Sequence, residues 1–225
     1  IYPSEGFEPD KTMHALKSES CTAVHGVPTM FSAMLASSEF NGKPIKSLRT
    51  GIMAGSQCPE VLMRRVLYDL GCSEITIAYG MTETSPISFQ SDVNDPVDVR
   101  VSTVGRIQPH CEVKIVEDDG STCAVGQTGE LWTKGYLVMK GYWNDTEATQ
   151  SSIENGWMKT GDLATIDNEG FCRIVGRKKD MVIRGGENIY PAELEEFLTA
   201  QKGILEAHVF GIPDEKFGEQ LVAWI

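Results

Sequence analysis

The chain has 225 residues, of which 41% are hydrophobic and 23% charged, so it has enough apolar sequence for one large domain or two smaller ones. Its formal net charge of -12 argues against a nucleic-acid-binding protein and against docking on anionic membranes, because both normally need a basic face. Anionic small molecules are compatible with this charge, since local backbone amides can bind phosphate on an acidic protein.

The cysteines and the apolar runs narrow the class of protein further. The six cysteines are scattered, and no two lie at CxxC spacing: Cys21, Cys58, Cys72, Cys111, Cys123 and Cys172. This pattern predicts neither a zinc or iron–sulfur site nor a disulfide scaffold, and it favours a reducing compartment. No run approaches the roughly 20 apolar residues that span a bilayer. Both ends read as cuts in a longer protein, so a targeting segment would be missing from this sequence.

The first hundred residues alternate helical and strand patterns. The expected elements are a helix capped by Asp10, a helix from Pro28, a strand over residues 49–54, a helix from Pro59 to Gly71 and a strand over residues 75–79. Helices that alternate with short apolar strands predict an α/β layer with a parallel sheet.

The remaining residues read as mostly β at first and then as a second mixed region. Residues 101–175 predict a twisted sheet or partial barrel, with a hairpin whose turn is residues 167–170. The charged segment 176–180 is a candidate linker. After it we expect a strand at 181–183, a loop at Gly185-Gly186, a helix from Pro191 and two further strands.

Residues 79–86, with the sequence Tyr-Gly-Met-Thr-Glu-Thr-Ser-Pro, are the sharpest candidate for a ligand site. They directly follow a strand, and ligands in open α/β sheets bind at the carboxyl ends of strands. Glycine lets a ligand approach the backbone, hydroxyls can bond phosphate, and a carboxylate can hold Mg²⁺. The simpler interpretation is a polar loop in which Thr82 or Thr84 caps a helix, and spacing alone slightly favours it.

Two further segments have the same double interpretation. Asp162, which follows Thr160-Gly161, can make an Asx-turn at the start of a strand, or it can bind both hydroxyls of a ribose. Arg177 could return to the same place across the hairpin, or it could be a surface charge. The double glycine at Gly185-Gly186 can be a tight turn or a passage for a thin ligand.

Four segments together resemble a known family. Residues 79–86, 160–163, 176–180 and 185–195 occur in this order and spacing in the acyl-adenylate-forming superfamily of acyl-CoA synthetases, peptide-synthetase adenylation domains and beetle luciferases. The run Gly-Gly-Glu-Asn-Ile-Tyr-Pro is most similar to the fatty acyl-CoA synthetases. The resemblance implies an α/β and α+β protein: residues 1–176 end a large AMP-binding domain, 177–180 form a hinge, and 181–225 begin a small domain.

The resemblance also implies a role for each matching residue. The implied adenine pocket comprises Gly55, Ser56, Ala78, Tyr79 and Gly80, with Tyr79 stacked on the base. Thr82 would bond the α-phosphate, Glu83 would hold Mg²⁺, and Asp162 and Arg177 would bind the ribose. The implied acyl-binding residues are His25, Val27 and Met81, with Met53 and Ile87 as further walls. The implied coenzyme A residues are Gly185, Gly186 and Glu187, and Lys179 takes the hinge position.

The implied reaction joins a fatty acid to coenzyme A with ATP and Mg²⁺, by way of an acyl-adenylate, and the implied location is the mitochondrial matrix. The family's phosphate loop and catalytic lysine match nothing in this sequence, so we expect this segment alone to be inactive. Two rival hypotheses remain: an adenylating enzyme with another acceptor, and a non-catalytic nucleotide-binding relative. A hydrolase of the Gly-x-Ser-x-Gly type has no support here.

Overall fold

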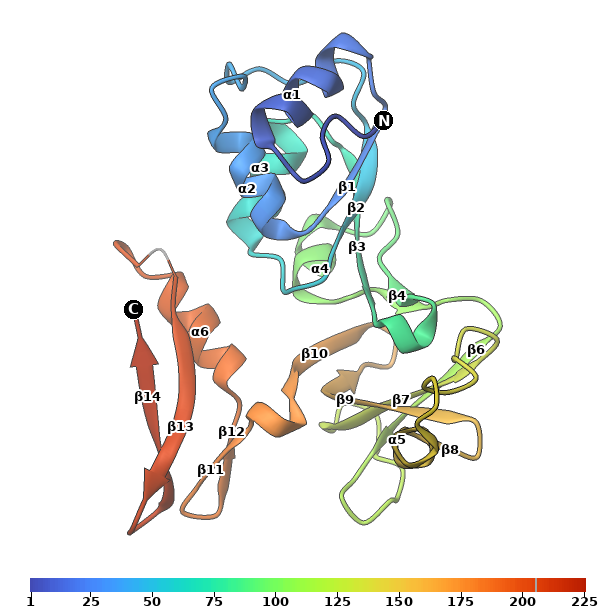
Figure 1. The fold of residues 1–225 in the computed structure, drawn as a ribbon. Helices are drawn as coiled ribbons and strands as arrows, with labels where there is room; N and C mark the ends of the chain where they lie inside the picture. Colours follow the sequence, from blue (N-terminus) through green and yellow to red (C-terminus); the bar gives the residue numbers. More distant parts are fainter. Residues whose placement is uncertain (205) are drawn as a thin grey trace. The chain divides into compact units, whose positions relative to one another are not determined.

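The computed structural model of the chain describes residues 1–204 and 206–225. These residues form two compact units, Ile1–Pro109 and His110–Ile225, and each is described by itself (Figure 1). In the described part of the chain, no helix is long and apolar enough to cross a membrane.

The first unit is built on a five-stranded sheet. Its strands, in spatial order, are β1 (Ala23–Gly26), β2 (Thr50–Ala54), β3 (Glu74–Gly80), β4 (Ile87–Gln90) and β5 (Arg106–Ile107). The pairs β1–β2 and β2–β3 are parallel, which confirms the predicted parallel layer. The pairs β3–β4 and β4–β5 are antiparallel, and the sequence analysis did not predict the two short strands β4 and β5.

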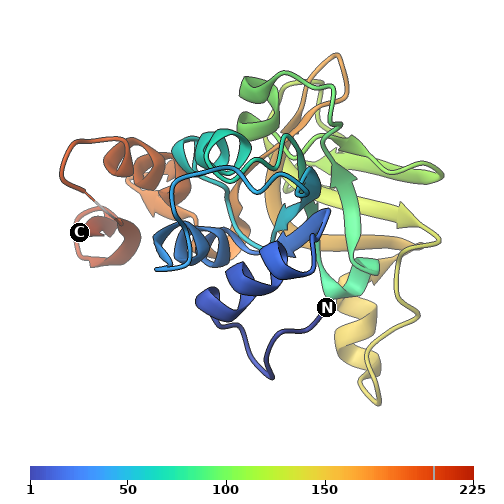
Figure 2. The same ribbon diagram turned by 90° about the horizontal axis from the view of Figure 1, so that it is seen from above.

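Helices supply the apolar core of this unit. The helical segments are α1 (Pro9–Ser18), α2 (Pro28–Ala36), α3 (Glu60–Tyr68), the 3-10 turn η1 (Thr82–Thr84) and α4 (Val97–Ser102). Helices α1, α2 and α3 lie together on one side of the strands β1 to β3 (Figures 1 and 2). The core beneath them contains Met13, Phe31, Met63 and Ile75, none of which is exposed.

Two predicted helix starts are wrong, the first by two residues and the second by one. Helix α1 begins at Pro9 and has Glu8, not Asp10, at its N-cap, because proline fits the first helical position. The Asp10 carboxylate instead accepts a hydrogen bond from Ser37 Oγ. Pro59 occupies the N-cap of α3, which starts at Glu60.

The second unit contains an antiparallel sheet of the predicted β type. Its spatial order is β10 (Cys172–Arg177), β9 (Trp157–Ile166), β7 (Gly129–Gly135) and β6 (Cys111–Val116), with β8 (Ile153–Glu154) also paired to β9. The expected hairpin is confirmed: Asp167 Oδ1 accepts hydrogen bonds from the amides of Glu169 and Phe171. A short helix, α5 (Thr146–Ser152), was not predicted, although Asp145 caps it by accepting from the Ala148 amide.

A second sheet of this unit follows the 3-10 turn η2 (Lys178–Asp180). Its order is β12 (Glu187–Ile189), β11 (Val182–Arg184), β14 (Gly218–Trp224) and β13 (His208–Asp214), and helix α6 (Pro191–Thr199) packs on β13. The expected glycine loop is a two-residue hairpin turn, with φ of +61° at Gly185 and +90° at Gly186. Strand β12 was missed because it is only three residues long and starts with two polar side chains.

Candidate functional site

The carboxyl ends of the three parallel strands meet at one edge of the first sheet. Ala54 in β2 pairs with Ala78 in β3, and Gly26 in β1 pairs with Met53 in β2. The residues that end or follow each strand are therefore neighbours: His25 to Val27, Gly55-Ser56 and Tyr79-Gly80. This edge is where an open parallel sheet places a ligand.

The side chains at this edge are mostly accessible. His25, Gly55 and Ser56 are exposed, and Val27 is 38% exposed. A side chain added at Gly55 would lie 3.0 Å from Val27 Cγ1, so the segments after β1 and β2 almost touch. Met53 is only 1% exposed and its sulfur lies 3.0 Å from Cys58 Sγ, so its place in the wall of the acyl pocket stays a prediction.

Tyr79 is the last residue but one of β3, and its ring is held by an aromatic contact. Its ring meets Phe89 of β4 edge to face, with ring centres 6.1 Å apart and an interplanar angle of 62°. Phe89 is 1% exposed and Tyr79 is half-buried. A ring held in this way can offer a face to a planar ligand such as a nucleobase.

Loop 81–86 is held by Thr84, which is fully buried. Its Oγ1 accepts from the Met81 amide at 3.2 Å and lies 3.1 and 3.0 Å from the carbonyl oxygens of Met81 and Pro86. Thr84 therefore closes the loop on itself. Thr82, in contrast, is exposed and Glu83 is half-buried. The structure thus separates a structural threonine from one that is available to a ligand.

The residues of this loop fit the Mg²⁺ that the family resemblance implies. Mg²⁺ is commonly bound through one or two carboxylates, with substrate phosphates and water completing its shell. Glu83 supplies one half-buried carboxylate beside the exposed Thr82. Among the described residues, no cluster of three or more His, Cys, Asp and Glu side chains forms an all-protein cage.

In the second unit, the hairpin brings Asp162 and Arg177 together as predicted. The two residues are paired in the β9–β10 register, and Arg177 Nε lies 3.5 Å from Asp162 Oδ1. The side chain of Asp162 is 14% exposed, whereas that of Arg177 is 63% exposed. A sheltered carboxylate beside an outward guanidinium can bind a diol or another small polar group.

A bulge in β9 positions Asp162. Glu130 pairs with Leu163 and Trp132 with Lys159, so residues 160–162 lie opposite Leu131 alone. Thr160 Oγ1 donates to the Leu131 carbonyl at 2.7 Å and accepts from the Asp162 amide at 3.1 Å. Asp162 thus lies inside strand β9 and not at its start. The local turn is made by the Thr160 hydroxyl, which accepts from the Asp162 amide two residues on, and not by the Asp162 carboxylate.

Three charged residues near this pair were missed by the sequence analysis. Lys178 Nζ lies 2.8 Å from Asp118 Oδ1 and 3.5 Å from Glu130 Oε2. Glu130 Oε1 also accepts from the Gly161 amide at 3.3 Å. The hydrogen bond to Asp118 is the main cause of a raised pKa at Lys178. No sequence motif marks Glu130 or Asp118, because only the β7–β9 pairing brings them to the bulge.

The remaining predicted site residues follow Arg177 in the sequence. Lys179 is exposed in η2, and Gly185, Gly186 and Glu187 are exposed at the β11–β12 turn. Next to that turn, the Arg184 guanidinium stacks on the Phe217 ring at 4.2 Å.

Comparisons with known proteins agree with these features. The model of the AMP-binding enzyme family matches residues 1–143. The whole chain is 52% identical to YngI of Bacillus subtilis (strain 168), which is provisionally named an acyl-CoA synthetase, and covers 41% of it. The whole chain is also 44% identical to the mitochondrial medium-chain acyl-CoA ligase ACSF2 of Danio rerio, of which it covers 38%. The chain therefore spans about two fifths of the length of these relatives.

Solved structures show the same fold. The o-succinylbenzoate coenzyme A synthetase MenE of Bacillus subtilis, in complex with ATP and a magnesium ion, is 34% identical and has a TM-score of 0.84. The match covers 96% of this chain and 44% of that structure. The predicted mixture of α/β and α+β layers is thereby confirmed.

Proposed function

The chain belongs to the AMP-binding enzyme family, and from this membership we propose that the full-length protein is an ATP-dependent acid–thiol ligase, an acyl-CoA synthetase. The observation that carries the proposal is the edge of the parallel sheet, where a fixed Tyr79 ring lies beside the exposed Thr82 and the half-buried Glu83. An aromatic ring can stack on a base, a hydroxyl can donate to a phosphate, and a carboxylate can bind a metal ion.

In the first step, a carboxylate oxygen of the acid attacks the α-phosphorus of ATP, and pyrophosphate leaves. This chemistry asks the protein mainly for positioning and charge neutralisation. We assign the adenine pocket to five residues: Gly55, Ser56, Ala78, Tyr79 and Gly80. Thr82 donates to an α-phosphate oxygen, and Glu83 would hold Mg²⁺, which neutralises phosphate charge when it is bound.

Asp162 and Arg177 bind the ribose in this proposal. The carboxylate of Asp162 accepts hydrogen bonds from the two hydroxyls, and charge-assisted bonds of this kind are among the strong ones. Arg177, whose Nε lies 3.5 Å from Asp162 Oδ1, adds donors of its own. His25, Val27 and Met81 at the edge of the parallel sheet form part of the acyl site.

In the second step, the thiol of coenzyme A attacks the acyl carbon and AMP leaves. Gly185, Gly186 and Glu187 border the path of the pantetheine arm, and the tight turn offers an exposed backbone for it. We propose Lys179 as the hinge between a large domain that ends at residue 176 and a small domain from residue 181. Rotation at such a hinge separates the two half-reactions.

The substrate class and the location are proposals drawn from the relatives. The zebrafish relative is named a mitochondrial medium-chain acyl-CoA ligase, so we propose a medium-chain fatty acid as substrate and the mitochondrial matrix as location. The other relative is bacterial, so the length of the acyl chain is a separate point to test. A series of fatty acids of increasing length tests the first point directly.

The test is pyrophosphate exchange into ATP by the full-length protein, with fatty acids of increasing length. Exchange should need a fatty acid and peak at one chain length. Glu83→Ala and Asp162→Ala should each lower its rate on the order of 100-fold. Asp98→Ala is the matched control, because the Asp98 side chain is 83% exposed on α4.

Near-normal exchange in both site variants would remove the proposed roles of Glu83 and Asp162. An assay of thioester formation with coenzyme A distinguishes the two adenylating alternatives. An acyl-CoA synthetase forms the thioester, and an adenylating enzyme with another acceptor does not. ATP binding without exchange for any acid would favour the non-catalytic alternative.

A further inference from the structure

Glu130 joins two neighbouring parts of the second unit through one carboxylate. Its Oε1 accepts from the Gly161 amide of β9 at 3.3 Å, and its Oε2 lies 3.5 Å from Lys178 Nζ of η2. The Glu130 side chain is only 15% exposed, whereas that of Lys178 is 42% exposed, so Glu130 is the sheltered partner. A sheltered carboxylate that faces an amide on one side and an ammonium on the other is well satisfied.

Both partners of Glu130 are next in sequence to a member of the Asp162–Arg177 pair. Gly161 immediately precedes Asp162, and Lys178 immediately follows Arg177. Glu130 therefore contacts one sequence neighbour of each member of the pair, the backbone amide of Gly161 and the side-chain ammonium of Lys178.

Lys178 has a second anchor, the carboxylate of Asp118 at 2.8 Å, in the turn after β6. Asp118 is 85% exposed and Glu130 is 15% exposed, so the ammonium is shared between an outer and an inner carboxylate. The outer contact is weakened by solvent, as exposed ion pairs are. The contact to Glu130 is longer, at 3.5 Å, but its carboxylate is the better sheltered of the two.

We propose that Glu130 is a positioning residue for nucleotide binding: it fixes the bulge that presents Asp162 and, through Lys178, the strand end that presents Arg177. This inference rests on the proposed function, because it assigns a role to the pair that binds the ribose. It adds a residue that touches neither ribose nor phosphate. Arg177 is 63% exposed and gains most from such an anchor, since an exposed side chain otherwise samples many rotamers.

The experiment measures ATP affinity and pyrophosphate exchange in the full-length protein with Glu130→Gln, Lys178→Met and the double variant. Each single variant should raise the KM for ATP about tenfold, with the kcat of exchange and the KM for the fatty acid unchanged. The double variant should lose little more than either single one, because both act through one contact. Lys178→Arg, which keeps the charge, should stay close to wild type.

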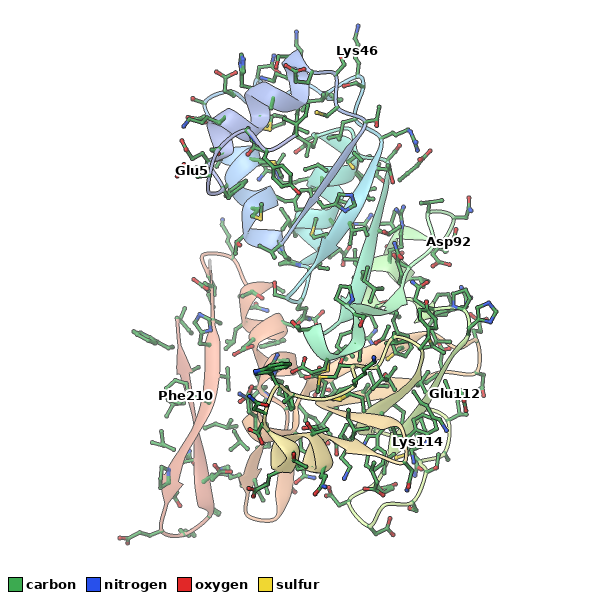
Figure 3. All side chains as sticks on the ribbon, turned by 45° about the vertical axis from the view of Figure 1, so that its right-hand side comes forward. Glu5, Lys46, Asp92, Glu112, Lys114 and Phe210 are labelled. Carbon is green, nitrogen blue, oxygen red and sulfur yellow. The ribbon has the colours of Figure 1, made fainter. Side chains whose placement is uncertain are left out.

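Two matched controls carry the same chemical changes at exposed positions. Glu112 on β6 and Lys46 before β2, both labelled in Figure 3, are exposed, so Glu112→Gln and Lys46→Met should leave the KM for ATP unchanged. Thermal melting shows whether each variant is folded. If Glu130→Gln does not fold, Lys178→Met tests the same contact from its exposed side.

The outcomes separate this inference from the proposed function. Exchange in the wild type, its loss in Asp162→Ala, and control-like KM values in Glu130→Gln and Lys178→Met would overturn the inference alone. A fall in kcat with KM unchanged, or fully additive losses in the double variant, would overturn it as well. A wild type that neither binds ATP nor exchanges pyrophosphate would overturn both.

Discussion

The two candidate regions, one in each unit, are built by different means. At the edge of the parallel sheet, the geometry is set by backbone: strand register places the segments, and the buried Thr84 hydroxyl closes loop 81–86. Around Asp162, charged side chains take part: Glu130 accepts from the Gly161 amide in the bulge, and Lys178 at the strand end is bound by Glu130 and Asp118. We therefore expect substitutions in the first region to damage the fold, and those in the second to weaken binding in a protein that stays folded.

The largest expected effect comes from Gly80→Ala, at the junction of β3 and the loop. A Cβ at Gly80 would lie 1.6 Å from the Pro86 carbonyl oxygen and 2.9 Å from Ile87 Cα, and these backbone atoms cannot move aside as a side chain does. We expect a loss of about 3 kcal/mol or more in the free energy of unfolding. Urea unfolding measures it, and pyrophosphate exchange should disappear with it.

The matched control for Gly80→Ala is Gly6→Ala, because nothing lies within 4 Å of the Cβ added at Gly6. Its stability should match that of the parent. If Gly80→Ala is as stable as Gly6→Ala, the loop is not fixed by backbone contact and the contrast between the two regions fails.

The next effect is the loss of one half-reaction in Lys179→Pro. Proline is tolerated in the first turn of a helix, so a proline within η2, which spans residues 178–180, should leave the fold intact. It stiffens the backbone at the proposed hinge. Acyl-adenylate formation should therefore persist in the full-length protein while thioester formation is lost.

Separate assays of the two half-reactions measure this, and Lys179→Ala provides the control for loss of the exposed side chain alone. Equal loss of both half-reactions in Lys179→Pro would remove Lys179 from the hinge role. That result would mean that both half-reactions depend on the same conformation of residues 177–180.

A smaller effect is expected for Thr84→Val in the first region. Valine keeps the shape but removes the hydroxyl that bonds Met81 and Pro86. The Met81 amide still donates to the Pro86 carbonyl and the Thr84 amide to the Met81 carbonyl, so the cost should be about 1 kcal/mol of the free energy of unfolding. Thr84→Ser, which keeps the hydroxyl, should cost less, and a Thr84→Val protein as stable as Thr84→Ser would show that the loop does not depend on this group.

The sequence predicted the first region better than the second for a physical reason. Apolar strands, Pro28 and the glycine after β3 are local signals, and they were enough to place residues 79–86 at a strand end. The meeting of Asp162 and Arg177 was also predictable, because a hairpin with a short turn fixes its own register. Glu130 and Asp118 could not be predicted, since they approach Lys178 only through pairing between strands far apart in the sequence.

The last prediction concerns the pH dependence of the free energy of unfolding. It compares the two units, because each has a fully buried thiol. Burial raises the pKa of Cys72 in the first unit and of Cys172 in the second from 9.0 to about 12. The unfolded thiol loses its proton above pH 9 while the native thiol keeps it. This contribution to stability is therefore complete below pH 9 and is lost as the pH rises towards 12.

The slope should be at most about 1.4 kcal/mol per pH unit for each thiol. Urea unfolding at several pH values between 8 and 11 measures it, with Cys72→Ala and Cys172→Ala compared by slope, not by absolute stability. Each variant should show a shallower fall than the parent. If only Cys72→Ala shows a shallower fall, the pH dependence of the free energy of unfolding between pH 8 and 11 comes from the first unit and not from the second. Slopes equal to that of the parent in both variants would contradict the burial of these thiols.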